Sequence, residues 1–185
     1  MGGAFSEIQG FKTNSMLLKA TKSLGIYPGL YYRVRYRVKN AIGWSEFSDI
    51  TYILSARRPD TPVPPTITLW QGVKIRVVFY LPFNGGSEIF KGYVELKGHD
   101  GVTYETEPQN CDATIDSIFD SRVCIIPLNI LRGPVWNLQQ GDSIVARVKF
   151  ENEIGLSLFS GDTVVPVLMP FTPHFPQNGP RRVNA

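Results

Sequence analysis

Few side chains in this sequence have the type and spacing that catalysis needs. The two histidines, His99 and His174, fall in a predicted turn and in the tail, and no Ser-His-Asp arrangement accompanies them. Gly-x-Ser-x-Gly is absent, and no Gly-rich loop leads into a predicted helix where it could cradle a phosphate. The sequence therefore predicts neither an enzyme nor a cofactor or small-molecule site.

Three acids, Asp112, Asp116 and Asp120, have a spacing that invites a metal site. An EF-hand loop needs oxygen ligands at alternate positions and a glycine at the sixth, and this stretch has neither. We expect a solvated acidic loop and no metal.

The two cysteines, Cys111 and Cys124, lie 13 residues apart, which fits no C-x-x-C metal or redox motif. A disulfide between them would stabilise the fold by ~3 kcal/mol in the chain-entropy model. The alternative is a pair of small buried thiols.

A row of cations forms one face of a predicted strand and consists of Arg33, Arg35, Arg37 and Lys39. Alternate residues on a strand lie ~6.8 Å apart, so the row could bind phosphates or an acidic protein surface such as a microtubule wall. The alternative is an ordinary solvated face whose long stems cover apolar neighbours. Residues 1–58 hold nine Lys and Arg against three acids, whereas residues 59–185 hold ten against thirteen.

The N-terminal Met-Gly-x-x-x-Ser matches the minimal myristoylation pattern through Gly2, a short motif that chance also produces. No apolar run approaches the ~18 residues that span a bilayer, so a membrane role would need a lipid or an anchored parent protein.

The elements that position these residues are predicted to be strands. Hydrophobic residues make up 43% of the 185 residues and charged residues 19%, a balance that excludes a disordered chain, and the 12% of aromatic residues favours strands. About seven short alternating stretches separated by turns are typical of an antiparallel β-sandwich. We expect the strands at Tyr32–Lys39, around Ile67–Leu69, at Lys74–Phe79, Gly92–Lys97, Val102–Glu105, Arg122–Ile126 and roughly Leu158–Val167. Leu128–Leu131 can form one helical turn.

One segment occurs twice. Residues 40–48 (NAIGWSEFS) align without a gap on residues 152–160 (NEIGLSLFS), at an offset of 112 residues. At the same offset Arg35 and Arg37 fall on Arg147 and Lys149. Each copy is an alternating strand, an Asn-x-x-Gly turn and a second strand, so the chain contains two copies of one module.

This pattern resembles fibronectin type III domains. Pro28-Gly29, then Tyr32, then the Asn40–Ser48 turn follow the family's order, and Tyr32 lies where the family has a tyrosine whose hydroxyl bonds back to the preceding turn. In the second copy Phe79–Pro82 corresponds to the family's Trp-x-x-Pro, and the segment from Asn84 to Tyr93 is similar to its Gly-Gly-Ser-x-Ile-x-x-Tyr. Phe79 replaces the core tryptophan and Ile144 replaces the tyrosine. The cysteine segment is similar to a variant in large multi-repeat proteins of protists.

The resemblance implies a complete domain at 66–168, with a Pro-rich linker before it at 59–65 and a Pro-rich tail, or the start of a further linker, at 169–185. Residues 1–58 correspond only to the C-terminal half of such a domain. The inward set Tyr32, Val34, Tyr36 and Val38 then needs an opposing sheet. We expect that the chain is a fragment of a longer protein or that another chain completes the fold.

The expected function is a non-catalytic structural or protein-interaction module in a larger surface, ciliary or cytoskeletal assembly. Its partners would be other protein chains or neighbouring domains. The alternative is binding of an acidic polymer surface, a microtubule or nucleic acid, by the basic strand. A disulfide at Cys111–Cys124 would imply an extracellular or cell-surface location, and free thiols a ciliary or cytoskeletal one.

Overall fold

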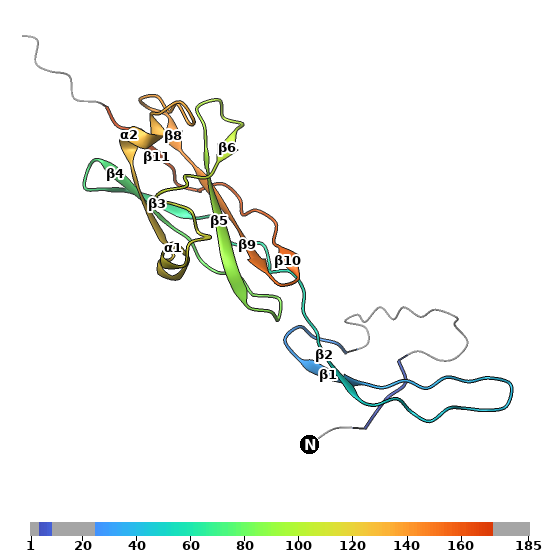
Figure 1. Ribbon diagram of the computed structural model, residues 1–185. Helices are drawn as coiled ribbons and strands as arrows, with labels where there is room; N and C mark the ends of the chain where they lie inside the picture. Colours follow the sequence, from blue (N-terminus) through green and yellow to red (C-terminus); the bar gives the residue numbers. More distant parts are fainter. Residues whose placement is uncertain (1–3, 9–24, 172–185) are drawn as a thin grey trace, which may run out of the picture.

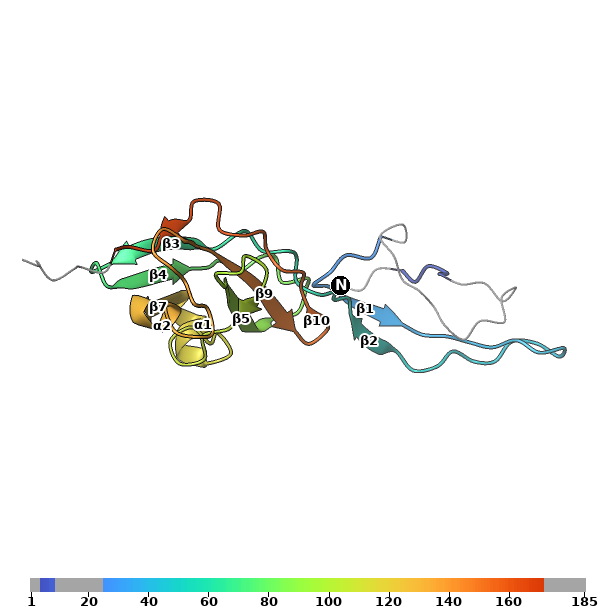
Figure 2. The same ribbon diagram turned by 90° about the horizontal axis from the view of Figure 1, so that it is seen from above.

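The computed structural model describes residues 4–8 and 25–171. Figure 1 shows a two-layered β unit that ends near Leu168, and a long hairpin that projects away from it. Seen from above in Figure 2, the unit and the hairpin lie end to end. Within the described residues no helix is long and apolar enough to span a membrane.

The first layer is a three-stranded antiparallel sheet in the order β3-β4-β7. It is built from β3 (Thr66–Trp70), β4 (Lys74–Val78) and β7 (Val123–Pro127). In the central strand β4, Ile75 pairs with Leu69 of β3, and Val77 pairs with Cys124 of β7. Alternate residues of β4 are buried, as expected for a strand with one packed face.

The second layer has the order β10-β9-β5-β6, all antiparallel. It comprises β5 (Ile89–Lys97), β6 (Tyr104–Glu105), β9 (Ala146–Asn152) and β10 (Gly155–Leu156). The long β5–β9 ladder has a register shift between Ile89 and Lys91. A short pair, β8 (Ser143–Ile144) with β11 (Val167–Leu168), extends this region.

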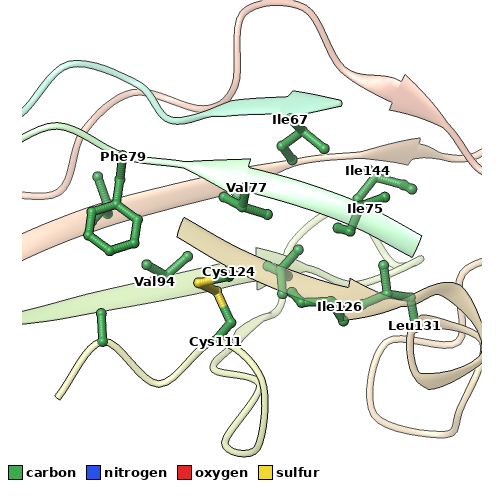
Figure 3. Packing of buried hydrophobic residues seen from close by; sticks show 14 of the residues in the cluster. Ile67, Ile75, Val77, Phe79, Val94, Cys111, Cys124, Ile126, Leu131 and Ile144 are labelled. Carbon is green, nitrogen blue, oxygen red and sulfur yellow. A yellow bond between two sulfur atoms is a disulfide. The ribbon is translucent and has the colours of Figure 1, made fainter. Parts of the chain in front are cut away.

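The core lies between the two layers (Figure 3). Ile75 and Val77 of β4 face Val94 of β5 and Val148 of β9, and all four are fully buried. Phe79 and Phe150 are also fully buried, with ring centroids 6.0 Å apart, so both anchor the core. The fold is an all-β antiparallel sandwich, as predicted.

Two short helices flank β7. The predicted turn is α2 (Leu128–Leu131). The acidic stretch, expected to be a solvated loop, instead contains α1 (Asp116–Ser121), which buries Phe119 against the core. Asp116 and Asp120 are exposed as expected, but the loop assignment was wrong because a six-residue segment with two adjacent apolar residues, Ile118 and Phe119, is too short to show a helical period.

The hairpin consists of β1 (Tyr31–Val34) and β2 (Thr51–Leu54), paired from Tyr31↔Leu54 to Val34↔Thr51. The strand predicted to reach Lys39 is regular only as far as Val34. Beyond it, Ser48 and Ser45 hydroxyls accept the backbone N–H groups of Tyr36 and Val38, both at 3.0 Å.

The last predicted strand departs from regularity for the same reason. Ser157, Ser160 and Thr163 hydroxyls accept the backbone N–H groups of Phe150, Val148 and Ala146. The strand predicted at Leu158–Val167 is therefore confined to Val167–Leu168.

A cation–aromatic ladder and an interlocked junction as the candidate functional site

The basic row on the hairpin is stacked on aromatic rings. The Arg35 guanidinium lies 4.0 Å from the ring centroids of both Phe5 and Phe47. Arg37 lies 4.8 Å from Phe47 and 4.4 Å from Trp44. A guanidinium over a ring face keeps its charge while its planar edge remains a hydrogen-bond donor.

The ends of the row follow the same pattern. Arg33 lies 5.1 Å from the Phe5 centroid, and the Lys39 ammonium lies 5.4 Å from that of Trp44. The structure therefore brings Arg33, Arg35, Arg37 and Lys39 together with three aromatic rings. We call these seven residues the ladder.

A second ladder occupies the equivalent strand of the sandwich. Arg147 lies between Tyr104 and Phe159, at 3.7 and 4.0 Å from their centroids, and Lys149 lies 4.3 Å from Phe159. Phe47 and Phe159 are separated by the repeat offset, as are Arg35 and Arg147. The two copies thus share their cation–aromatic contacts as well as their sequence.

The turns of the two copies also match atom by atom. Asn40 Oδ1 accepts the backbone N–H groups of Ile42 and Gly43, and Asn152 Oδ1 accepts those of Ile154 and Gly155. In the first copy the Tyr32 hydroxyl accepts the Tyr27 N–H at 2.9 Å and donates to the Gly25 carbonyl at 3.3 Å. This confirms the bond from Tyr32 back to the preceding turn.

The inner faces of the two copies differ sharply in burial. On the sandwich strand Ala146, Val148 and Phe150 are fully buried beneath the first layer. On the hairpin Tyr36 is 69% exposed and Val38 is 62% exposed. The hairpin therefore presents an apolar surface that its copy packs against a sheet.

The two cysteines lie at the sandwich core. Cys111 and Cys124 are both buried and their sulfurs are bonded, with Cα atoms 4.9 Å apart. Figure 3 shows the bond next to Val94 of β5. It links the irregular segment before α1 covalently to β7.

The hairpin meets the sandwich at a junction that sequence reasoning missed. Arg57 N–H donates to the Gly85 carbonyl at 2.8 Å, while the Arg57 carbonyl accepts from Asn152 Nδ2 at 2.8 Å. The same Asn152 amide donates to the Asn84 carbonyl at 2.8 Å. Asn152 thus accepts hydrogen bonds within its own turn and also donates to the Arg57 carbonyl just before the linker.

Two glycines allow the close approach at this junction. Gly86 has φ +88°, and a Cβ there would lie 2.1 Å from the backbone N of Gly29. Gly85 has φ +70°, and a Cβ there would lie 2.2 Å from the Arg57 carbonyl oxygen. Any side chain at these positions would force the loop away from the Pro28-Gly29 turn that precedes β1 or from the backbone of Arg57.

A crevice of about 380 Å³ opens beside this contact. The end of β2 contributes Leu54, the sandwich contributes Phe90, and Glu88 and Glu153 provide acidic walls.

The remaining candidates add no chemistry. His99 Nδ1 lies 2.6 Å from Asp142 Oδ2, a pairing that ties the β5–β6 turn to the loop before β8. Among residues 4–8 and 25–171 no group of three His, Cys, Asp or Glu could hold a metal ion. Gly2 lies outside the described residues.

Comparison with known proteins gives likenesses of structure. No family model matches the sequence, and no curated protein matches it significantly. Similar solved structures include fibronectin type III domains. The sixth such domain of human fibronectin type III domain containing protein 3 is 20% identical, with a TM-score of 0.43 over 67% of this chain and 92% of that one.

Others are regions of titin and twitchin. Domains A168–A170 of titin are 20% identical with a TM-score of 0.46, and the kinase region of C. elegans twitchin is 21% identical with a TM-score of 0.44. The match covers 72% and 61% of this chain but only 39% of the titin structure and 17% of the twitchin structure. At such identities and TM-scores below 0.5 the likeness concerns the fold alone, and the strand order and core of the chain itself establish the sandwich.

Proposed function

We propose that this protein is a non-catalytic structural module that binds other protein chains through its hairpin. One observation carries the proposal: the inner face of the hairpin is exposed at Tyr36 and Val38, whereas the same face of the repeated strand is fully buried. Large exposed apolar surfaces on folded proteins are typical of interaction sites. Residues 1–58 would be the C-terminal half of a domain, 59–65 the linker and 66–168 the complete domain.

The junction supports a spacer role for the sandwich. The backbone N–H of Asp60 in the linker donates to the Phe83 carbonyl, Asn152 bonds Arg57 just before the linker, and the Gly85-Gly86 loop is in steric contact with the Pro28-Gly29 turn that precedes β1. Such a junction fixes the direction in which the hairpin projects. Tandem domains with Pro-rich linkers behave as semi-rigid spacers in larger assemblies.

The Cys111–Cys124 bond supports a location in an oxidising compartment, at the cell surface or outside the cell. A non-reducing mass measurement on native protein tests this. A mass that corresponds to two free thiols would favour a ciliary or cytoskeletal location instead.

Photo-crosslinking tests the binding role. A photoreactive amino acid replaces Tyr36 in the full chain, and a matched variant carries it at Tyr80, an exposed tyrosine of the sandwich. In an extract of the source organism we expect protein adducts at position 36 well above those at position 80. Equal protein adducts at both positions, or none at 36, would contradict the proposal. Salt-sensitive nucleic-acid adducts at 36 would favour the acidic-polymer alternative, since phosphate contacts weaken as salt rises.

A further inference from the structure

The two copies of the repeated strand differ in how many neighbours they have. In the sandwich β9 lies between β10, which follows it in the chain, and β5. In the first copy β1 pairs with β2, and the stretch after β1 that contains Arg35 contacts Ser45 and Ser48, which also follow it in the chain. On their other side, β1 and this stretch pair with no strand of the described residues, so those residues include no equivalent of β5.

An unsatisfied arginine lies where that missing strand would provide an acid. In the sandwich Arg147 donates from Nε and from an Nη to Oε2 of Glu95 on β5, at 2.9 and 2.6 Å. Arg35 is its equivalent in sequence and is stacked between two rings in the same way. Yet Arg35 Nε is buried without a hydrogen-bond partner in the part of the chain that the structure describes. A buried donor without an acceptor is costly, so this atom indicates a missing carboxylate.

The residues that flank Glu95 indicate the rest of the pattern. Val94 pairs with Val148 and Leu96 pairs with Ala146, and all four are buried. At the repeat offset Val148 corresponds to Tyr36 and Ala146 to Val34. A strand on the edge of β1 would therefore place apolar side chains on the uncovered inner face and a carboxylate on Arg35.

We propose that the edge formed by β1 and the following residues Arg35 and Tyr36, which pairs with no described strand, binds an extended segment of another polypeptide, antiparallel, with an Asp or Glu between two apolar residues. The carboxylate would accept the Arg35 N–H groups, and the apolar neighbours would cover Val34 and Tyr36. Strand addition of this kind gains affinity from main-chain hydrogen bonds and specificity from alternate side chains. The proposal rests on the binding role above and names the partner's chemistry. A nucleic acid would supply the charge without the apolar side chains.

The chain itself supplies a probe for the experiment. A fluorescent peptide with the sequence of residues 89–97 (IFKGYVELK) carries the β5 pattern. We expect it to bind the full chain in an anisotropy titration. The peptide in which Glu95 is replaced by Gln should bind at least about tenfold more weakly, because it loses a charge-assisted hydrogen bond. Peptide binding that is absent, or equal for both peptides, would overturn the proposal.

Variants of the protein assign the binding to β1. Arg35→Lys keeps the charge but removes Nε and the planar fork, and should weaken the unaltered peptide about tenfold. Arg76→Lys, on β4 of the sandwich, is the matched control and should leave binding unchanged. Equal effects of the two substitutions would contradict binding at β1. If Arg35→Lys does not fold by circular dichroism, the two peptides on the unaltered chain decide alone.

Crosslinking and peptide binding together separate this proposal from the binding role, and sedimentation separates it from self-association. Protein adducts at position 36 without peptide binding would leave the binding role standing and remove the strand chemistry. Sedimentation of the free chain reports a dimer if a second copy occupies the edge. A dimer that the peptide does not dissociate would overturn the foreign-strand proposal.

Discussion

Side chains at equivalent positions of the two copies carry the same interactions but have different surroundings. Arg147 is stacked on two rings and neutralised by Glu95, whereas Arg35 has the rings without a carboxylate among the described residues. The stack positions the guanidinium before any partner arrives. Preorganisation of this kind reduces the entropy that binding must overcome.

Among single residues, Phe79 should contribute strongly to the free energy of unfolding of the sandwich. It is fully buried against Phe150, so Phe79→Ala should lower the free energy of unfolding by ~3–5 kcal/mol. Tyr80→Ala, at an exposed neighbouring position, is the control and should cost less than about 1 kcal/mol. Urea denaturation of the full chain measures both. Similar losses in the two variants would mean that the strand register after β4 is shifted by one residue.

Tyr93 is the residue whose ionisation reports on the second layer. Its hydroxyl donates to Glu151 Oε2 at 2.6 Å, and this bond, with partial burial, raises the pKa of Tyr93 to about 12. Because the neutral phenol is favoured in the folded state, the stabilisation is complete below pH 10 and is lost as the pH rises towards 12.

Absorbance at the tyrosinate band measures this ionisation. Tyr93→Phe should remove the component that titrates last, and Glu151→Gln should lower the pKa of Tyr93 because a neutral acceptor favours the phenol less. Glu105→Gln, on exposed β6, should leave the curve unchanged. Retention of the late component in Glu151→Gln would show that burial alone causes the shift.

At the scale of elements, the disulfide holds an irregular connection against a regular sheet. Cys111 precedes α1 and Cys124 lies on β7, so the bond closes a loop whose ends are 13 residues apart in sequence. Replacing both cysteines by alanine should reduce the free energy of unfolding by about 3 kcal/mol. Denaturation of the variant beside the oxidised chain measures the difference. A loss below about 1 kcal/mol would show that the packing around β7 holds this connection without the bond.

The strands were predictable because their residues alternate, and the repeat was predictable because both turns use the same asparagine and serines. Period-two patterns fixed β4, β5 and β9 within a few residues. The ends of the hairpin strands were not predictable, since beyond Val34 a serine hydroxyl, that of Ser48, replaces a backbone carbonyl as acceptor of the Tyr36 N–H. Helix α1 was missed because a single buried residue, Phe119, positions it.

The candidate site could be predicted only in part. The basic row was evident from alternation, but its aromatic partners come from positions 5, 44 and 47, which no local pattern connects to it. The junction could not be predicted from the sequence for a similar reason. In the sequence Gly85 and Gly86 are only part of a family-like segment, and their role depends on the backbone that approaches them in space.

At the scale of the whole molecule, close backbone contacts join the basic hairpin to the sandwich. The contact of Gly86 with Gly29 leaves no room for a Cβ, and the Asn152 side chain donates to the Arg57 carbonyl just before the linker. The direction of the hairpin is then set by backbone contacts rather than by long side chains. These contacts resist salt better than surface ion pairs do.

Gly86→Ala should therefore loosen the junction without unfolding either part. The added Cβ would meet the backbone of Gly29 at 2.1 Å in a conformation with φ +88°, so the loop must move away from the turn that precedes β1. Gly72→Ala is the matched control, because Gly72 also has a positive φ, +71°, but has open space around its Cβ. We expect Gly86→Ala to broaden the distance distribution between spin labels on the hairpin and on the sandwich, while Gly72→Ala retains the narrow distribution of the unaltered chain. Both variants should retain the circular dichroism spectrum of the unaltered chain. Equally narrow distributions in the two variants would show that the linker, and not the interlocked glycines, sets the direction of the hairpin.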